Sequence, residues 1–388
     1  MPPALTQLAN FDVGAFLRDS WQQKPLLIRQ AFEAWSNPLD PDELAGLACE
    51  PGVESRLITQ SGDRWGLEHG PLAEERFGRM DKAPWTLLVQ AVDHHVPEVA
   101  ALLEPFRFIP NWRVDDVMVS YAVDGGGVGA HFDNYDVFLV QGLGQRRWQV
   151  GARCDHTTQL LPHDDLRLLA NFEPTAEWIL DPGDILYVPP GVPHNGIAVG
   201  DDCMTYSIGF RAPSRGELIA GWTQYLAGEL EDDDRYADPG LSVQENPGEI
   251  SREALGRLRE MVAERVLDAA GFVRWFGEYS TAPKSHDIDW RPERPLTLED
   301  VRSGVAARIP VLRNPASRFA FVALAAGSLN LFVDGRTYPC SPSAASLAGR
   351  LCAGPRLELG EEALESEEGL ALLMELVNRG SVAFEPRD

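Results

Sequence analysis

The sequence predicts an α+β protein of several domains, in which a β-barrel comes first and helices and a mixed module follow. The chain has 388 residues, which fits two or three ordinary domains. Short β-rich runs bounded by Gly, Pro and Asp fill much of the first 211 residues, a pattern typical of barrels and sandwiches. Beyond residue 212, apolar residues recur at helical spacing. We therefore expect domains at 1–211, 212–282 and 283–388.

The first zone holds nearly all of the strand-like alternation. Its β-rich runs are 117–123, 135–141, 145–150, 184–189 and 204–210. The first hundred residues are more mixed, and we expect helical pieces at 13–21 and 84–104.

The second zone is predicted to be helical. Ser214 and Glu217 form a capping box in front of an apolar helical pattern. A second helix is expected from about Ser251, with an apolar stripe formed by Leu255, Leu258, Val262 and Val266. Two or three helices cannot bury both faces alone, so they pack on the barrel or on a second subunit. We favour a dimerisation segment, and hence a homodimer.

The third zone mixes strand-like and helical segments, which suits a small winged-helix-like domain. A winged helix is often assumed to bind DNA, but this segment is not basic. A protein-contact or structural role is the interpretation that we favour.

Composition narrows the class of protein further. Apolar residues make up 44% and charged residues 24%, which indicates a folded, soluble chain. No run approaches the roughly 20 apolar residues of a membrane span, and no signal peptide is recognised at the N-terminus. The cysteines are scattered and fit a reduced, cytoplasmic protein: Cys49, Cys154, Cys203, Cys340 and Cys352. The net charge of −25 disfavours nucleic-acid binding and favours a basic protein partner, although it can also serve solubility alone.

Two short motifs predict a metal site. His131 and Asp133 are two residues apart in a strand-like segment after a Gly-rich turn, so both side chains can share one face. A strand end and tight turn, with Pro189 and Gly191, then delivers His194. Two histidines and a carboxylate on one side of a metal leave positions open, which suits non-haem Fe(II) and oxygen chemistry. The first domain is accordingly predicted to be a cupin-type double-stranded β-helix.

The remaining histidines have no partner at ligand spacing in a strand, so surface or packing roles are expected. They are His69, His94, His95, His156, His163 and His286. No cysteine lies near the three predicted ligands in the sequence, which argues against a structural zinc site.

The segments 16–32, 111–151 and 181–198 closely resemble the bacterial JmjC-type ribosomal oxygenases. The resemblance covers most of the chain and is looser after residue 240. It implies a JmjC barrel, a helical dimerisation segment and a C-terminal winged helix. It also implies an enzyme that uses Fe(II), 2-oxoglutarate and O2 to hydroxylate an arginine of large-subunit ribosomal protein sixteen.

The resemblance also suggests roles for single residues. The metal ligands match His131, Asp133 and His194, and the basic residue for the distal carboxylate of 2-oxoglutarate matches Arg146. Guanidinium binds carboxylate in a bidentate way, and strand alternation turns Arg147 to the opposite face. Ser120 either adds a hydroxyl contact to 2-oxoglutarate or is an ordinary strand residue.

Three further positions resemble residues that contact the substrate arginine: Asp116, Met118 and Tyr135. Asp116 and Met118 share one strand face. The alternative is that Asp116 is a surface residue and Tyr135 a core residue. Two other functions remain open: a JmjC oxygenase acting on another residue, as a histidine hydroxylase or a demethylase, and a non-catalytic cupin regulator or adaptor.

Overall fold

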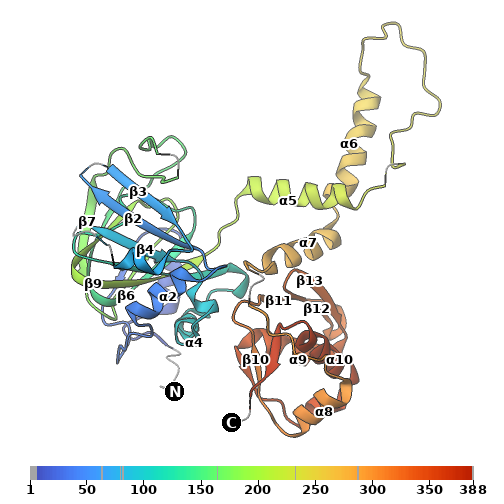
Figure 1. The fold of residues 1–388 in the computed structure, drawn as a ribbon. Helices are drawn as coiled ribbons and strands as arrows, with labels where there is room; N and C mark the ends of the chain where they lie inside the picture. The colour runs from blue at the N-terminus through green and yellow to red at the C-terminus, as the bar shows by residue number, and fades with distance from the viewer. Residues whose placement is uncertain are drawn as a thin grey trace. The chain divides into compact units, whose positions relative to one another are not determined.

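The computed structural model describes residues 7–386, except 63, 79, 81–82, 164, 232 and 286–287. The chain divides into two compact units (Figure 1). The first comprises the described residues up to Ala212, together with Lys284–Trp290 and Arg313–Ala316. The second comprises Pro213–Pro283, Arg291–Leu312 and the described residues from Ser317 onward. The three-domain division at 211 and 282 stays a proposal, in which the helical segment is set apart from the winged helix.

The first unit is built on one antiparallel sheet of nine strands. The strands are β1 (Leu26–Ile28), β2 (Ser55–Ser61), β3 (Arg64–His69), β4 (Trp85–Val89), β5 (Val114–Ala122), β6 (Asp136–Gly151), β7 (Pro174–Leu180), β8 (Ile185–Val188) and β9 (His194–Phe210). Their order is β1-β8-β6-β9-β5-β4-β2-β3, and β7 pairs with β6. The long strands β6 and β9 pair along almost their whole length and bring both predicted motifs together.

Short helices accompany this sheet. They are α1 (Val13–Asp19), α2 (Pro41–Cys49), α3 (Glu74–Phe77) and α4 (Pro97–Ala100), with 3₁₀ turns at Val92–His94, Ala101–Phe106 and Asn111–Arg113. The helical piece expected at 13–21 is α1. The prediction of a helix over 84–104 is wrong in its first part, because Trp85–Val89 is strand β4, paired with β2 and β5. A strand buried on both faces reads as a continuous apolar run, which periodicity cannot distinguish from a buried helix.

The central strands separate two apolar clusters by simple alternation. Val117 and Val119 of β5 pack with Phe138 in the large cluster that also contains Phe16 of α1. Leu139 of β6 belongs to a second cluster. The register places Met118 opposite Ser207 and Ser207 opposite Leu139, so the even-numbered residues of β5 share the face of this second cluster. That face carries the predicted site.

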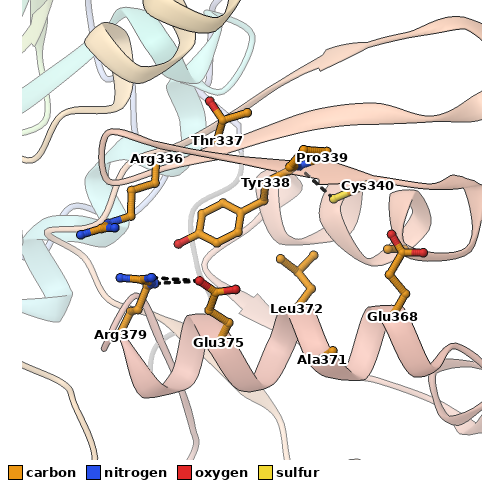
Figure 2. A pocket seen from close by; sticks show the side chains of 11 residues that line it. Arg336, Thr337, Tyr338, Pro339, Cys340, Glu368, Ala371, Leu372, Glu375 and Arg379 are labelled. Atoms are coloured by element: carbon orange, nitrogen blue, oxygen red, sulfur yellow. Dashed lines mark hydrogen bonds and ion pairs between the residues drawn. The ribbon is translucent and has the colours of Figure 1, made fainter.

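The second unit contains helices and two small sheets. The helices are α5 (Arg215–Gly228), α6 (Arg252–Val266), α7 (Ala269–Thr281), α8 (Leu298–Ala306), α9 (Pro342–Ala353) and α10 (Glu367–Asn378). The strands are β10 (Val311–Arg313), β11 (Phe319–Ala323), β12 (Leu329–Val333), β13 (Arg336–Cys340), β14 (Arg356–Leu357) and β15 (Val382–Phe384). They form the sheets β14-β10-β15 and β11-β12-β13. Strand β13 and helix α10 border a groove (Figure 2).

Several local expectations for the second unit are borne out. Ser214 and Glu217 form the predicted capping box at the start of α5. Helix α6 begins after Ser251, and its apolar stripe of Leu255, Leu258, Val262 and Val266 is exposed in the monomer. Of the helices that the structure describes, none has the length and apolar character needed to cross a membrane.

Candidate functional site

The two predicted motifs meet at one end of the long strand pair. His131 and His194 form an antiparallel bridge, with backbone N–H···O distances of 3.1 and 2.8 Å. The Asp133 carboxylate lies 3.9 Å from His131 Nε2 and 3.7 Å from His194 Nε2. One ligand atom from each residue lies within 4.8 Å of the others, which is the spacing that one metal ion requires.

Asp133 reaches this cluster from a loop and not from the strand that the sequence predicted. The backbone N–H of Gly191 donates to the Asp133 carbonyl at 2.7 Å, which ties the two motifs together. Gly191 has a φ of +76°, a conformation that favours glycine. The tight turn was therefore predictable, whereas the loop geometry of Asp133 was not.

Backbone carbonyls orient both imidazoles for metal binding. His131 Nδ1 lies 2.9 Å from the Gly129 carbonyl, and His194 Nδ1 lies 3.2 Å from the Val192 carbonyl. With the proton on Nδ1, the Nε2 lone pair of each ring is turned to the Asp133 side. Burial, followed by the neighbouring His131, lowers the pKa of His194 to about 4. Two neutral imidazoles and a carboxylate fit a divalent metal ion.

Within the described part of the chain, this is the one cluster of three or more His, Cys, Asp or Glu side chains with ligand geometry. His69, His94, His95, His156 and His163 belong to no such cluster. His286 lies outside the described residues.

Arg146 is buried on the same face of β6 as the metal cluster. It is 3% exposed, and its Nε and Nη2 atoms have no hydrogen-bond partner in the described part of the protein. Its guanidinium carbon lies 5.8 Å from the centre of the Trp148 ring, and that ring centre is 5.7 Å from the His194 ring. Trp148 thus connects Arg146 with the metal cluster.

Trp148 is a site residue that sequence reasoning missed. It lies two positions after Arg146 on the same strand, so alternation alone places both on one face. Its position opposite Gly196 makes room for the indole, because a Cβ atom at Gly196 would lie 2.6 Å from the ring. The indole Nε1 has no hydrogen-bond partner among the described residues.

Ser120 and Met118 lie on the predicted face of β5. Ser120 is buried, and its hydroxyl donates to the Thr205 carbonyl at 3.5 Å. Met118 is half-buried opposite Ser207. Their roles toward 2-oxoglutarate and substrate stay predictions.

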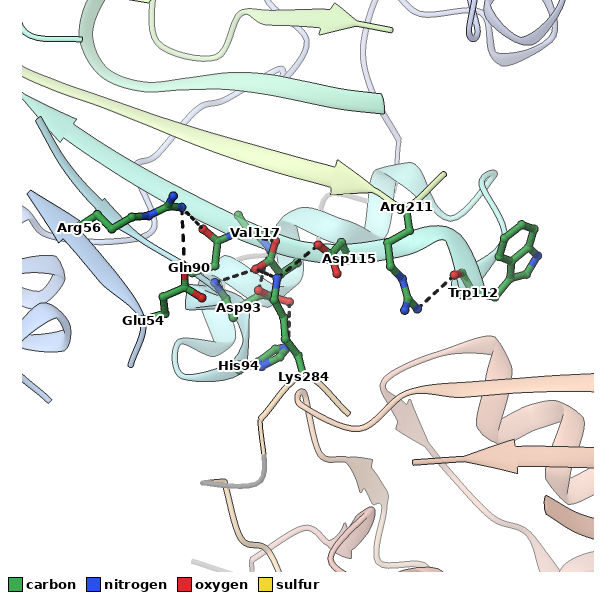
Figure 3. A network of polar contacts seen from close by, with 12 residues as sticks. Glu54, Arg56, Gln90, Asp93, His94, Trp112, Asp115, Val117, Arg211 and Lys284 are labelled. Atoms are coloured by element: carbon green, nitrogen blue, oxygen red, sulfur yellow. Dashed lines mark hydrogen bonds and ion pairs between the residues drawn. The ribbon is translucent and has the colours of Figure 1, made fainter. Parts of the chain in front are cut away.

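Asp116 is buried and is not a surface residue. It bonds to Lys284, which belongs to the polar network of Figure 3 together with Asp93 and Asp115. The Asp116 carboxylate accepts from the backbone N–H of Ala91 at 3.0 Å and from Lys284 Nζ at 2.7 Å. Lys284 also lies 3.3 Å from the Asp115 carboxylate. Burial raises the pKa of Asp116, while the Lys284 charge opposes that shift.

The same network contains a second buried carboxyl group. Asp93 accepts from the backbone N–H of Val117 at 2.8 Å, and its carboxylate lies 3.9 Å from His94 Nε2. Burial raises the pKa of Asp93 to about 7. Neither Lys284 nor Asp93 was predicted from the sequence, since no motif links residues 168 positions apart, as Lys284 and Asp116 are.

Tyr135 lies next to the metal cluster and remains 43% exposed, so it is not a core residue. Its phenol interacts with the Asp133 carboxylate. Desolvation raises the pKa of Tyr135, and the charges of Asp133, Asp116 and Asp115 raise it further. Tyr135 therefore lies within electrostatic reach of both the metal cluster and Asp116.

Comparisons with known proteins agree with this geometry. The family model "JmjC domain" matches residues 101–218, "AraC-like ligand binding domain" matches 175–269 and "ROXA-like winged helix" matches 266–383. The chain is 38% identical over 373 residues to the ribosomal protein uL16 3-hydroxylase of Escherichia coli, covering 95% of this chain and 97% of that protein. It is 36% identical over 271 residues to a probable ribosomal oxygenase of Haemophilus influenzae, covering 66% and 65%.

A solved structure of the E. coli ribosomal oxygenase YcfD, in complex with cobalt and 2-oxoglutarate, superposes with a TM-score of 0.86. The two chains are 35% identical, and the match covers 98% of this chain and 99% of that one.

The barrel and the open three-residue cluster define a JmjC-domain oxygenase. More narrowly, the chain belongs to the ribosomal oxygenase family. The predicted fold class of barrel and winged helix is confirmed. The predicted enzyme class, a 2-oxoglutarate-dependent hydroxylase with Fe(II), 2-oxoglutarate and O2, is confirmed at the level of the family.

Proposed function

We propose that this chain hydroxylates an arginine side chain of large-subunit ribosomal protein uL16. In this proposal, His131, Asp133 and His194 hold Fe(II), and Arg146 binds the distal carboxylate of 2-oxoglutarate. The name of the E. coli relative, a ribosomal protein uL16 3-hydroxylase, supports the choice of substrate protein. The observation that carries the proposal is the unpartnered Arg146 guanidinium beside the metal cluster.

A buried guanidinium without an acceptor is costly, because its charge has lost its hydration without gaining a partner. A dicarboxylate resolves this: one end chelates the metal and the other pairs with Arg146. The Trp148 ring is near both binding points, 5.8 Å from the Arg146 guanidinium carbon and 5.7 Å from the His194 ring, and supplies an apolar wall. Ser120, on the same face, is proposed to contribute a hydroxyl contact. The bound iron would supply the activation of O2, and the residues described here position the reactants around it.

The substrate side is proposed to consist of Asp116, Met118 and Tyr135. Asp115 and Asp116 bring two carboxylates to a single ammonium group, that of Lys284. The Asp116 carboxylate is the group proposed to pair with a guanidinium of the substrate. The net charge of −25 would also speed the encounter with a basic ribosomal protein.

A homodimer is part of the proposal. Leu255, Leu258, Val262 and Val266 form an exposed apolar stripe on α6, of the kind that marks protein–protein contacts. Light scattering after size exclusion should give twice the 42.8 kDa chain mass. The double variant Leu258→Arg, Val262→Arg should be monomeric and folded; a monomeric wild type would refute the dimer.

The function is tested with the full chain, Fe(II), ascorbate, 2-oxoglutarate and fragments of uL16. Mass spectrometry should find the gain of one oxygen atom on a single arginine, with succinate formed in equal amount. His131→Ala should abolish both. Modification of no arginine in any basic ribosomal fragment would refute the proposal.

The same assay separates the alternatives. A histidine hydroxylase would add oxygen to a histidine-containing fragment, and a demethylase would release formaldehyde from a methylated peptide. A non-catalytic regulator would consume no 2-oxoglutarate with any fragment, and the His131→Ala variant would retain its function. The proposal places the enzyme in the cytoplasm, where ribosomal proteins are made.

A further inference from the structure

The second unit contains a groove that the proposed oxygenase reaction does not use. It has a volume of about 380 Å³ and lies between strand β13 and helix α10 (Figure 2). Tyr338 projects from β13 into the space above α10, with its hydroxyl on the side of Arg336, Arg379 and Glu375. Leu372 of α10 lies along the apolar part of the groove.

The Tyr338 hydroxyl has no hydrogen-bond partner within the described residues, although Tyr338 is only 8% exposed. Other buried tyrosines of this protein are satisfied: Tyr187 donates to Asp136 at 2.6 Å, and Tyr206 donates to Asn37 at 2.9 Å. A buried hydroxyl without a partner is destabilising, so the presence of Tyr338 here points to a ligand that accepts a hydrogen bond from its hydroxyl.

Charged groups of both signs line the groove, Arg336 and Arg379 with Glu368 and Glu375. Arg379 is paired with Glu375 through Nε and Nη2, both at 3.0 Å. Arg336 is exposed and has no ion pair with any described residue, so its guanidinium can bind an acid. Burial raises the pKa of the Tyr338 phenol, Arg379 and Arg336 lower it, and Glu375 and Asp334 raise it. An incoming acceptor would gain the unpaired Arg336 guanidinium and the Tyr338 hydroxyl donor.

One part of the groove is apolar. Pro339 of β13, Ala371 and Leu372 of α10 and Ala344 of α9 line it, and Glu368 of α10 and Thr337 of β13 add polar groups. Inorganic anions would gain nothing from the apolar side chains, whereas a hydrocarbon chain would bury area on them. The ligand therefore needs a charged head and an apolar body.

We propose that this groove binds a carboxylate carried on a short apolar body. Arg336 pairs with the carboxylate, and the Tyr338 hydroxyl donates to one of its oxygens. Two sources have this chemistry: a free aliphatic monocarboxylate, and the C-terminal residue of a polypeptide that ends in an apolar side chain. The site does not depend on the metal cluster or on the proposed arginine substrate.

The test is calorimetric titration of the metal-free full chain carrying Arg146→Met, so that the barrel site has lost its carboxylate-binding groups and no 2-oxoglutarate competes for the groove. The probes are octanoate, an acetylated peptide ending in Ala-Ala-Leu with a free carboxyl group, the same peptide amidated, and inorganic phosphate. We expect octanoate or the free-acid peptide to bind, and the amidated peptide and phosphate to bind at least tenfold more weakly.

Variants locate the binding. Tyr338→Phe and Arg336→Gln should each weaken carboxylate binding about tenfold, whereas Arg308→Gln, outside the groove, should leave the affinity unchanged. If octanoate binds and the free-acid peptide does not, the groove is a small-molecule site. If the peptide binds and octanoate does not, the groove binds a polypeptide C-terminus. Absence of binding by both, equal binding of phosphate, or affinity unchanged in Tyr338→Phe and Arg336→Gln overturns the proposal.

Discussion

The barrel and the winged-helix domain each contain, beside a proposed ligand site, a buried polar side chain without a hydrogen-bond partner among the described residues, but the two side chains differ in charge. In the barrel it is Arg146, a charge at 3% exposure. In the winged helix it is the neutral Tyr338, at 8% exposure. An uncompensated buried charge costs about 3–5 kcal/mol, whereas an unpaired hydroxyl costs about 1–3 kcal/mol. The barrel therefore depends more strongly on a ligand than the winged helix does.

At another position of the barrel unit, a buried charged side chain is well paired. Asp136 accepts from Tyr187 at 2.6 Å and from Arg113 and Gln22 at 2.9 Å each. The same fold thus satisfies a buried carboxylate fully at one position and leaves a guanidinium open at another. That contrast supports the proposal that Arg146 binds an acid.

The largest expected effect comes from Arg146→Met. Removing the cation should weaken 2-oxoglutarate binding by at least about 100-fold, roughly 3 kcal/mol. The unfolding free energy of the ligand-free protein should not fall, because the variant removes an unpaired charge from an apolar site. Titration with 2-oxoglutarate and urea unfolding measure the two quantities.

Arg147→Met is the matched control for this prediction, since Arg147 lies on the opposite face of the same strand. It should bind 2-oxoglutarate like the wild type. A large loss of stability in Arg146→Met without 2-oxoglutarate would show that Arg146 has a structural partner, and the contrast with Tyr338 would fail.

The sequence predicted the chemistry of the barrel better than its detailed shape. His131 and His194 could be placed because turn residues and strand alternation act over a few positions, whereas Arg146 was assigned from the family resemblance. Asp133 sits in a loop held by Gly191, a contact between distant segments that no periodicity encodes. Strand β4 was mistaken for helix because its burial on both faces removes the alternation.

What the sequence could not predict is mostly long-range pairing. Lys284 lies in a segment that looks like a linker, and its partner Asp116 is 168 residues away. Trp148 was predictable from its spacing to Arg146 but is equally typical of a core residue. The Tyr338 groove depends on how β13 meets α10, which local patterns do not determine.

A second prediction concerns Asp93, a buried group of the barrel unit that has partners. Its pKa of about 7 in the folded protein lies above the ordinary value of 3.8, so the folded state binds the proton more tightly. Its contribution to stability is therefore complete below about pH 4 and is lost as the pH rises to 7. Between pH 5 and pH 8 the loss should be roughly 2–3 kcal/mol, since pH 5 lies about two units below the folded pKa and each unit corresponds to 1.36 kcal/mol.

Asp93→Asn keeps an acceptor for the Val117 N–H and should flatten this dependence. Urea unfolding at pH 5 and pH 8 measures it, with Asp116, His94 and Lys284 as the other titratable groups nearby. An unchanged difference between the two pH values would assign the dependence to those groups.

A third prediction concerns whether Asp116 binds the substrate or only pairs with Lys284. Asp116→Asn should lower kcat/KM for the uL16 fragment about tenfold and leave 2-oxoglutarate binding unchanged, because a charge-assisted bond to the guanidinium is lost. Lys284→Met should lower kcat/KM less than Asp116→Asn does, since the Asp116 carboxylate remains. Equal losses in both variants would mean that Asp116 acts only as the partner of Lys284.

The smallest expected effect concerns Tyr338 of the winged-helix domain. Tyr338→Phe removes a hydroxyl that has no described partner, so the unfolding free energy of the ligand-free protein should stay unchanged or rise by up to about 1 kcal/mol. Tyr187→Phe, which breaks the 2.6 Å bond to Asp136, should instead be destabilising. Urea unfolding of both variants at one pH gives the contrast. If Tyr338→Phe destabilises the protein as much as Tyr187→Phe, the Tyr338 hydroxyl has a hydrogen-bond partner in solution. The unpaired Arg146 of the barrel would then have no counterpart in the winged helix.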